Sequence, residues 1–503
     1  MVQLKTCFTK LRIFKPSKVF LGSISGIAYV AVNIIITIVV TPYLIVALGA
    51  VTFGLWKVSR NYFNLVGIFD GKNSVNLKYL VSKSLDYNIV EINSHLSNAM
   101  KFWRLTLPLV LVSSCAVYFV LKEQIGREIL DVNTELFVLG LTLYTVVNSI
   151  IAIFLSLIAG LNRIVFVNVL NCISVIFING ALLLAAYLNV GVEGMAAGLV
   201  VAAIMLLVSV FYYTRRSFPK IRLAFVGRPK SEGFKEYSKN SLWLFLWSLF
   251  VKLSLALEVL LTPFLLGLNF VTSLVVSFLL FTASNSVSLA ISSSFVPTLG
   301  QLLTQSSDDR FDNLVFDSEN ITRLIAGLSA IFVLVFNAHF VSAWVGDHLF
   351  IGREANCVLA LMTYQFALIR NKSQILDLLN FTRFKVLVAI FSIIVLSTFL
   401  YFKQSFSMFY LLLAIFMSRE LVRLNFEYKL YRYFHHVRII SIRNFRPHIV
   451  SFLTYVTIIT FYINLNYFNS LLPGLLVFIV YSTILIIHYQ EVIVRMLWNR
   501  FDD

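Results

Sequence analysis

Four cationic side chains lie deep inside segments that are apolar enough to cross a bilayer: Lys57, Arg60, Lys252 and Arg370. A charge near the bilayer centre costs about 2.5–3.5 kcal/mol on insertion scales, so four charges of one sign need a partner. An anionic cargo would supply it, since arginine offers two parallel hydrogen bonds and lysine a point charge. The sequence therefore predicts an anion-binding site inside a membrane protein.

Amide and hydroxyl groups accompany these cations at helical spacing. On a 3.6-residue period they share a helix face with a cation, or form a polar face of a further apolar segment. Such faces are expected to line a wet interior, although serine-rich faces of membrane helices also serve as packing surfaces. The expected cavity lining consists of Asn61, Asn64, Asn285, Ser288 and Gln374.

Two carboxylates lie in the same apolar segments, Glu258 and Asp377. Glu258 does not share a helix face with Lys252, so its partner must be a proton or a residue of another helix. Both carboxylates are candidates for ion coupling. The alternative is that such groups pair with the intramembrane cations and hold the helices together.

Composition defines the class of protein that carries these groups. Hydrophobic residues make up 59% of the 503 residues and charged residues 13%, whereas charged residues are about 25% of a soluble chain. Apolar stretches long enough to span a bilayer follow one another along the chain. We expect an all-α polytopic membrane protein with about fourteen transmembrane helices. The expected spans are approximately 20–46, 51–71, 100–121, 135–159, 164–187, 192–213, 241–265, 270–299, 323–345, 355–379, 384–402, 406–424, 448–467 and 471–492.

Lysine and arginine concentrate in every second loop, which by the positive-inside rule places both termini in the cytoplasm. The net charge of +17 arises in these loops, so nucleic acid is not an expected partner. The expected organisation is a six-helix half (1–214), a basic linker (215–240), a second six-helix half (241–424), a basic loop (425–447) and a terminal helix pair with a tail (448–503). At the end of the twelfth span, Arg419, Glu420 and Arg423 are expected to anchor it to headgroups.

An internal repeat supports the division into two halves. Thr41-Pro42-Tyr43-Leu44, Gly49 and Val51-Thr52 recur six spans later as Thr262-Pro263-Phe264-Leu265, Gly267 and Val271-Thr272. Duplicated halves are how many transporters build a central site that opens alternately to either side.

Several short motifs carry a resemblance that covers most of the chain. They are Pro42 with Gly49 and Phe53-Gly54-Leu55-Trp56, then Phe69-Asp70-Gly71, Pro297, and Phe340-Val341-Ser342-Ala343-Trp344-Val345-Gly346. In this order the sequence resembles the polysaccharide transporters that include the Wzx-like O-antigen flippases, within the superfamily of MATE exporters and lipid II flippases. Lys57 and the Lys72-Asn73 pair depart from the family pattern, which bears on the glycan rather than on the fold.

The resemblance implies a flippase of the bacterial inner membrane that moves a polyprenyl-pyrophosphate-linked oligosaccharide to the periplasmic leaflet. Lys57, Arg60, Lys252 and Arg370 would neutralise the pyrophosphate, which cannot cross hydrocarbon uncompensated. The implied partners are this glycan lipid and membrane lipids, with a polysaccharide polymerase and a chain-length regulator as further candidates. No cofactor and no metal site are expected.

Two other classes of function stay open at this stage. A MATE-like small-molecule antiporter would carry cationic drugs and would favour acidic groups in its cavity. A membrane enzyme of glycan assembly would need an external catalytic domain or a constellation of carboxylates, and the sequence shows neither, so no catalytic residue is assigned. Within the flippase class, capsular, teichoic or peptidoglycan precursors are alternative cargoes.

Overall fold

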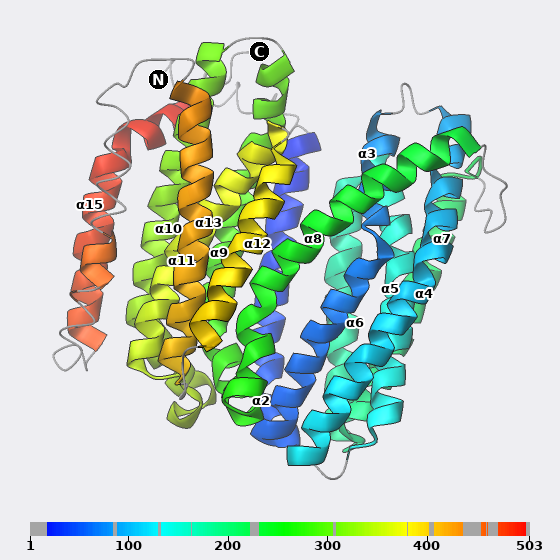
Figure 1. Ribbon diagram of the computed structural model, residues 1–503, viewed down its shortest axis with the longest axis horizontal. Coiled ribbons are helices and arrows are strands. Elements are labelled where there is room, and N and C mark those ends of the chain that lie inside the picture. Colours follow the sequence, from blue (N-terminus) through cyan, green and yellow to red (C-terminus); the bar gives the residue numbers. More distant parts are fainter. Residues whose placement is uncertain are drawn as a thin grey trace, which may run out of the picture.

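The computed structural model describes residues 18–83, 88–128, 132–161, 163–221, 231–304, 308–379, 381–401, 407–435, 454–458, 460 and 471–498. All regular structure in these residues is helical, and the long helices run between the upper and lower ends of the molecule (Figure 1). The helices of the first half are α2 (Lys18–Val66), η1 (Gly67–Asp70), α3 (Asn73–Lys83), α4 (Ile89–Glu128), α5 (Thr134–Gly160), α6 (Ile164–Tyr187) and α7 (Gly191–Ser217). They are followed by α8 (Ser231–Leu265), α9 (Leu268–Thr304), α10 (Asp308–Val345), η3 (Asp347–Leu349), α11 (Arg353–Leu378), α12 (Thr382–Tyr401), α13 (Met408–His435) and α15 (Leu471–Trp498).

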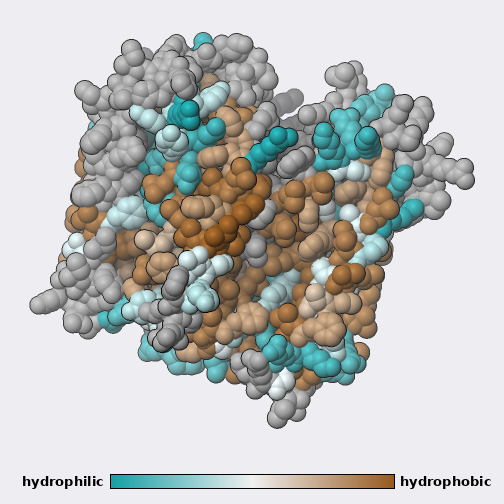
Figure 2. Space-filling model, viewed as in Figure 1, coloured by the Kyte–Doolittle hydropathy of each residue, from teal (hydrophilic) through white to brown (hydrophobic). Residues whose placement is uncertain are grey.

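The protein is a multi-pass membrane protein. Eight helices within the described ranges are long and apolar enough to cross a bilayer. Apolar side chains form a broad middle band on the visible face, with polar side chains above and below it (Figure 2). The all-α fold class is confirmed, while the count of fourteen spans and the orientation stay predictions.

Several helices begin well before the apolar spans that the sequence shows. α4 begins at Ile89, α8 at Ser231 and α10 at Asp308, and α13 continues through His435 into the segment expected as a basic loop. The sequence analysis also did not anticipate α3. Hydropathy detects only the part of a helix that lies in hydrocarbon, so polar turns beyond the membrane escape it.

The repeated Thr-Pro motifs lead to two matching sharp bends. α2 is broken at Gly49, whose φ of 75° lies in the left-handed region, and its two arms contain the first expected span and most of the second. Gly267, with a φ of 98°, separates α8 from α9 at the equivalent place of the repeat. Glycine adopts such backbone conformations without the steric cost that a Cβ atom would bring.

The two bends bring the halves together at the lower end of the molecule in Figure 1, which the charge pattern predicts to be external. The Thr272 hydroxyl donates to the Ala50 carbonyl at 2.5 Å. Gly54 lies so close to the Leu268 carbonyl that any Cβ atom would clash with it. Trp344 adds a third link, because its Nε1 donates to the Ile38 carbonyl at 2.7 Å.

Towards the upper end the helices of the two halves spread apart, and α8 crosses between them (Figure 1). The start of α8 is fixed to the first half through Asn76, which donates to the Tyr237 carbonyl at 3.0 Å and to the Ser241 hydroxyl at 2.9 Å. The Tyr237 hydroxyl donates to the Asn73 carbonyl at 3.0 Å. Burial raises the pKa of Tyr237, so the hydroxyl keeps its proton.

Two large apolar cores correspond to the two sides of this arrangement. One joins buried side chains of α2, α4, α5, α6 and α7 with the first turn of α9. The other joins buried side chains of α9 through α13 with α15. The domain boundaries drawn from the sequence stay predictions.

Candidate functional site

The second arm of α2 carries two of the predicted cations, Lys57 and Arg60. We call Lys57, Arg60, Asn61 and Asn64 the α2 cation stripe. Within the described residues, no carboxylate oxygen lies within 4.0 Å of the Lys57 amine or the Arg60 guanidinium. Asn61 is oriented by its own helix, because its Nδ2 donates to the Lys57 carbonyl at 3.0 Å.

Aromatic rings take the place of acidic partners around the two cations. The Arg60 guanidinium carbon lies 4.8 Å from the centre of the Tyr144 ring and 5.8 Å from that of Trp56. The Lys57 amine lies 5.1 Å from the centre of the Phe53 ring. Ring faces attract a cation without neutralising its charge. Arg60 Nη1 is buried and, in the part of the chain that the structure describes, has no hydrogen-bond partner.

The helix that packs beside α2 supplies the polar groups expected from the 270–299 span. α9 contacts α2, and Asn285 and Ser288 are 6% and 3% exposed, so both point into the protein. Asn285 Oδ1 and Ser288 Oγ are buried without a hydrogen-bond partner among the described residues. Unsatisfied buried acceptors and hydroxyls suit a ligand that brings its own polar groups.

The remaining predicted site residues lie on the second half. Arg370 and Gln374 are half-buried on α11, which packs on α9, α10 and α13. Lys252 belongs to α8, but its side chain lies outside the described residues. The structure therefore places the predicted cations on both halves, and only Lys57 and Arg60 are brought together on one helix.

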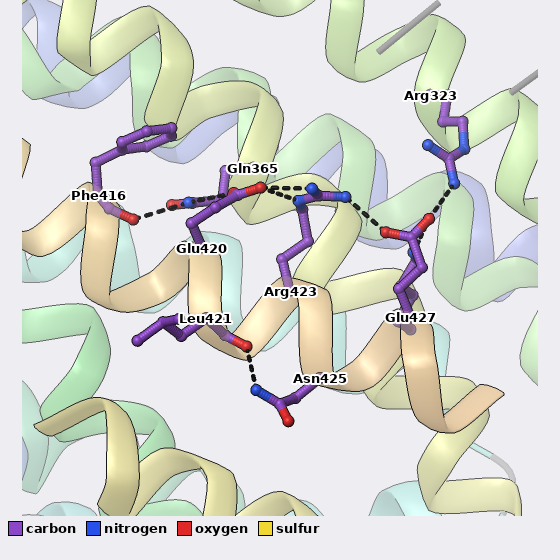
Figure 3. Close-up of polar contacts among 9 residues, drawn as sticks. Arg323, Gln365, Phe416, Glu420, Leu421, Arg423, Asn425 and Glu427 are labelled. Carbon is purple, nitrogen blue, oxygen red and sulfur yellow. Dashed lines mark hydrogen bonds and ion pairs between the residues drawn. The ribbon is translucent and has the colours of Figure 1, made fainter. Parts of the chain in front are cut away.

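A second set of buried charges, which sequence reasoning missed, joins α10, α11 and α13. We call Arg323, Lys372, Glu420, Arg423 and Glu427 the paired-charge network, and Figure 3 labels Arg323, Glu420, Arg423 and Glu427. Glu427 accepts from Arg323 at 3.2 Å, from Arg423 at 2.6 Å and is 3.0 Å from the Lys372 amine.

The network continues along α13 from Glu427 to Glu420. Arg423 Nε donates to Glu420 at 2.7 Å, and Gln365 Nε2 donates both to Glu420 at 2.8 Å and to the Phe416 carbonyl at 2.9 Å (Figure 3). Arg323 and Lys372 are 2% and 1% exposed. Every cation of this network therefore has a carboxylate partner inside the protein.

Both candidate coupling carboxylates are also engaged with cations. Arg419 holds Glu258 through two parallel hydrogen bonds of 2.5 and 3.0 Å, which link α13 to α8. Asp377 accepts from Lys385 at 2.5 Å, and with a side chain 44% exposed it is not the buried group that the sequence suggested. Both carboxylates are therefore ion-paired in this structure, and their role in ion coupling stays a prediction.

The expectation that Arg419 and Arg423 anchor a helix end to headgroups is wrong. They are 3% and 9% exposed and pair with carboxylates inside the protein. The spacing of Glu420, Arg423 and Glu427 on one helix face was a signal that could have identified the network. These charges lie where the apolar span was expected to end and a basic loop to begin, so they were interpreted as residues at a helix end.

Comparison with solved structures shows which known proteins share this fold. No protein-family model and no curated protein sequence matches the chain. A structure of the lipid II flippase MurJ in an inward closed conformation superposes with a TM-score of 0.64 at 14% identity, covering 94% of this chain and 99% of that one. A MATE in complex with MaD5 gives a TM-score of 0.58 at 12% identity, covering 82% of this chain and 95% of that one.

An inward-facing multidrug resistance MATE family transporter of the MOP superfamily gives a TM-score of 0.57 at 12% identity, covering 82% of this chain and 98% of that one. These likenesses show that the chain has the fold that the lipid II flippase shares with the MATE transporters. The protein is thus a multi-pass membrane protein of this fold, and within the described residues no carboxylate oxygen lies within 4.0 Å of the Lys57 amine or the Arg60 guanidinium.

Proposed function

We propose that this protein is a flippase that moves a polyprenyl-pyrophosphate-linked oligosaccharide, an O-antigen or similar surface polysaccharide unit, across the bacterial inner membrane. The observation that carries the proposal is the α2 cation stripe. Lys57 and Arg60 face rings and no carboxylate within 4.0 Å among the described residues, so an anionic ligand would complete their neutralisation.

The pyrophosphate would bind at Lys57 and Arg60, with Lys252 and Arg370 contributing from the second half. Asn61, Asn64, Asn285, Ser288 and Gln374 would contact sugar hydroxyls along the path. MurJ, which shares this fold, is a flippase of lipid II, and this likeness supports a lipid-linked cargo here. A cationic drug would be repelled by the stripe, which weighs against a MATE-like antiporter. No step of this transport requires catalysis, so we propose that the protein is not an enzyme.

The arrangement of the halves supports transport by alternating access. The halves are joined at the predicted external end through Thr272 and Trp344 and spread apart at the predicted cytoplasmic end. This is the arrangement expected of a transporter ready to receive cargo from the cytoplasm. Rocking of the halves would then break the external contacts and expose the site to the periplasm.

The test compares charge-neutralised variants in a strain from which the gene has been deleted. Arg60→Gln and Lys57→Met are expected to abolish surface polysaccharide and to cause completed lipid-linked units to accumulate, while the protein still inserts. Arg104→Gln is the matched control, because Arg104 is an exposed cation on α4 of the same half. Normal surface polysaccharide in both stripe variants would overturn the proposal.

A further inference from the structure

A cavity of about 430 Å³ lies in the first half, away from the α2 cation stripe. It forms where α4 and α6 begin and where α5 and α7 end, at the predicted cytoplasmic end of these helices. Its volume is in the range of about 300–1,000 Å³ that is usual for ligand pockets. The lining residues are Ile89, Ile92, Leu161, Arg163, Ser217, Phe218, Pro219, Lys220 and Ile221.

The wall of the cavity is apolar and well packed on one side. Ile92 and Ile221 are 1% and 7% exposed and belong to one apolar cluster with α3 and α5 side chains. The chain beyond α7 is held over α4, because Asn93 Nδ2 donates to the Lys220 carbonyl at 3.4 Å. The segment after α7 that lines the cavity is therefore packed on α4 and on the neighbouring helices.

Two cations stand at the cavity on exposed positions, Arg163 and Lys220. Arg163 is also the N-cap residue of α6 and makes no side-chain capping hydrogen bond, so the positive end of the helix dipole adds to its charge. The acidic group nearest along α4 is Glu91, which is not part of the lining and lies 3.3 Å from His95. The charged part of the cavity thus favours an anion.

The apolar surface beside the cavity distinguishes a lipid from a soluble anion. The first turns of α6 expose Val165 and Val169, at 39% and 47%, directly after Arg163. A helix of a membrane protein exposes such a face to acyl chains, whereas a soluble phosphate ion would gain nothing from it. A ligand whose anionic group meets Arg163 would therefore find exposed apolar side chains on the next turns of the same helix.

We propose that this cavity binds one anionic phospholipid of the cytoplasmic leaflet as a resident lipid and not as cargo. The headgroup phosphate lies between Arg163 and Lys220, and the upper part of an acyl chain lies against Leu161, Phe218 and the Val165–Val169 face of α6. The cytoplasmic leaflet is rich in anionic lipid, and each cation near its surface contributes about 1 kcal/mol of attraction.

The test measures lipid binding to the purified full-length protein by native mass spectrometry. The probes are phosphatidylglycerol and phosphatidylcholine at equal concentration in the same detergent. Wild-type protein is expected to retain one phosphatidylglycerol in preference to phosphatidylcholine. Arg163→Gln with Lys220→Gln is expected to weaken retention about 5-fold for each cation removed, which is the fold-change equivalent to about 1 kcal/mol.

Arg215→Gln with Arg216→Gln is the matched control, because it removes the same charge from the last turn of α7 without touching the cavity lining. Equal losses in both double variants would show diffuse surface attraction and overturn the proposal. Leu161→Trp should exclude the lipid with no change of charge. Displacement of the lipid by inorganic phosphate, or equal retention of phosphatidylcholine, would also overturn it, and neither result depends on whether the protein exports a glycan.

Discussion

Two sets of intramembrane cations, one on each half of the molecule, are neutralised in different ways. On the second half, Arg323, Lys372, Arg419 and Arg423 each lie within 4.0 Å of a carboxylate supplied by the protein. On the first half, Lys57 and Arg60 face aromatic rings and have no such carboxylate among the described residues. The difference shows that an intramembrane cation alone does not mark a ligand site. A ligand site is indicated instead by an intramembrane cation that has no carboxylate of the described protein within 4.0 Å.

The largest loss of stability is expected at Glu427, because this one carboxylate pairs with three cations. Glu427→Gln removes the common acceptor of Arg323, Lys372 and Arg423, and removal of one member of a buried ion pair costs about 3–5 kcal/mol. Unfolding in detergent at fixed lipid content would measure the loss. Glu354→Gln, at an exposed position at the start of α11, should change stability little. Equal stability of the two variants would mean that the paired-charge network does not hold the second half together.

The next largest loss of stability is expected at the Glu258–Arg419 pair. Variants of this pair also distinguish a structural role of Glu258 from a role in ion coupling. Glu258→Leu alone removes one member of a buried ion pair and should destabilise the protein by about 3–5 kcal/mol, whereas the double variant with Arg419→Met should recover most of this loss. A double-mutant cycle on unfolding free energies gives the coupling between the two side chains.

Transport by that stable double variant then decides the role of Glu258. Export with an unchanged dependence on pH and on sodium would show that the pair is structural. Loss of that dependence in a folded protein would restore Glu258 as a coupling group.

The sequence predicted the helical class because nearly every membrane helix carries a long apolar stretch. Its internal repeat also identified Gly49 and Gly267 as equivalent positions, and the structure has a bend at each of them. It did not predict the paired-charge network. Periodicity assigns a residue to a face of its own helix, but it cannot say which helix that face meets. Lys372 of α11 pairs with Glu427 of α13, and no spacing within either helix could show that these two faces meet.

The same reasoning explains what was found and missed at the candidate site. The polar stripe on α2 could be predicted because Lys57, Arg60, Asn61 and Asn64 are local in sequence. The ring of Tyr144 beside Arg60 could not, because it comes from α5 and depends on tertiary packing.

Arg60→Gln is expected to change the free energy of unfolding much less than Glu427→Gln does. Arg60→Gln removes a half-buried charge without leaving a carboxylate unpaired among the described residues, so the free energy of unfolding should stay within about 1 kcal/mol of wild type. The same detergent unfolding assay measures it. A loss as large as that of Glu427→Gln would give Arg60 a structural partner and would remove the contrast between the halves.

The smallest effect concerns the ring that faces Arg60. The Tyr144 ring lies 4.8 Å from the guanidinium carbon, and a cation–π contact is worth about 0.5–1 kcal/mol at exposed sites and about 2 kcal/mol or more when desolvated. Tyr144→Leu should therefore raise the glycan-lipid concentration needed for half-maximal transport in proteoliposomes several-fold, because Arg60 loses its fixed position. Tyr144→Phe keeps the ring face and should behave as wild type. If Tyr144→Phe were impaired as much as Tyr144→Leu, the hydroxyl group and not the ring face would support transport. The aromatic ring would then not act on Arg60 in place of a carboxylate.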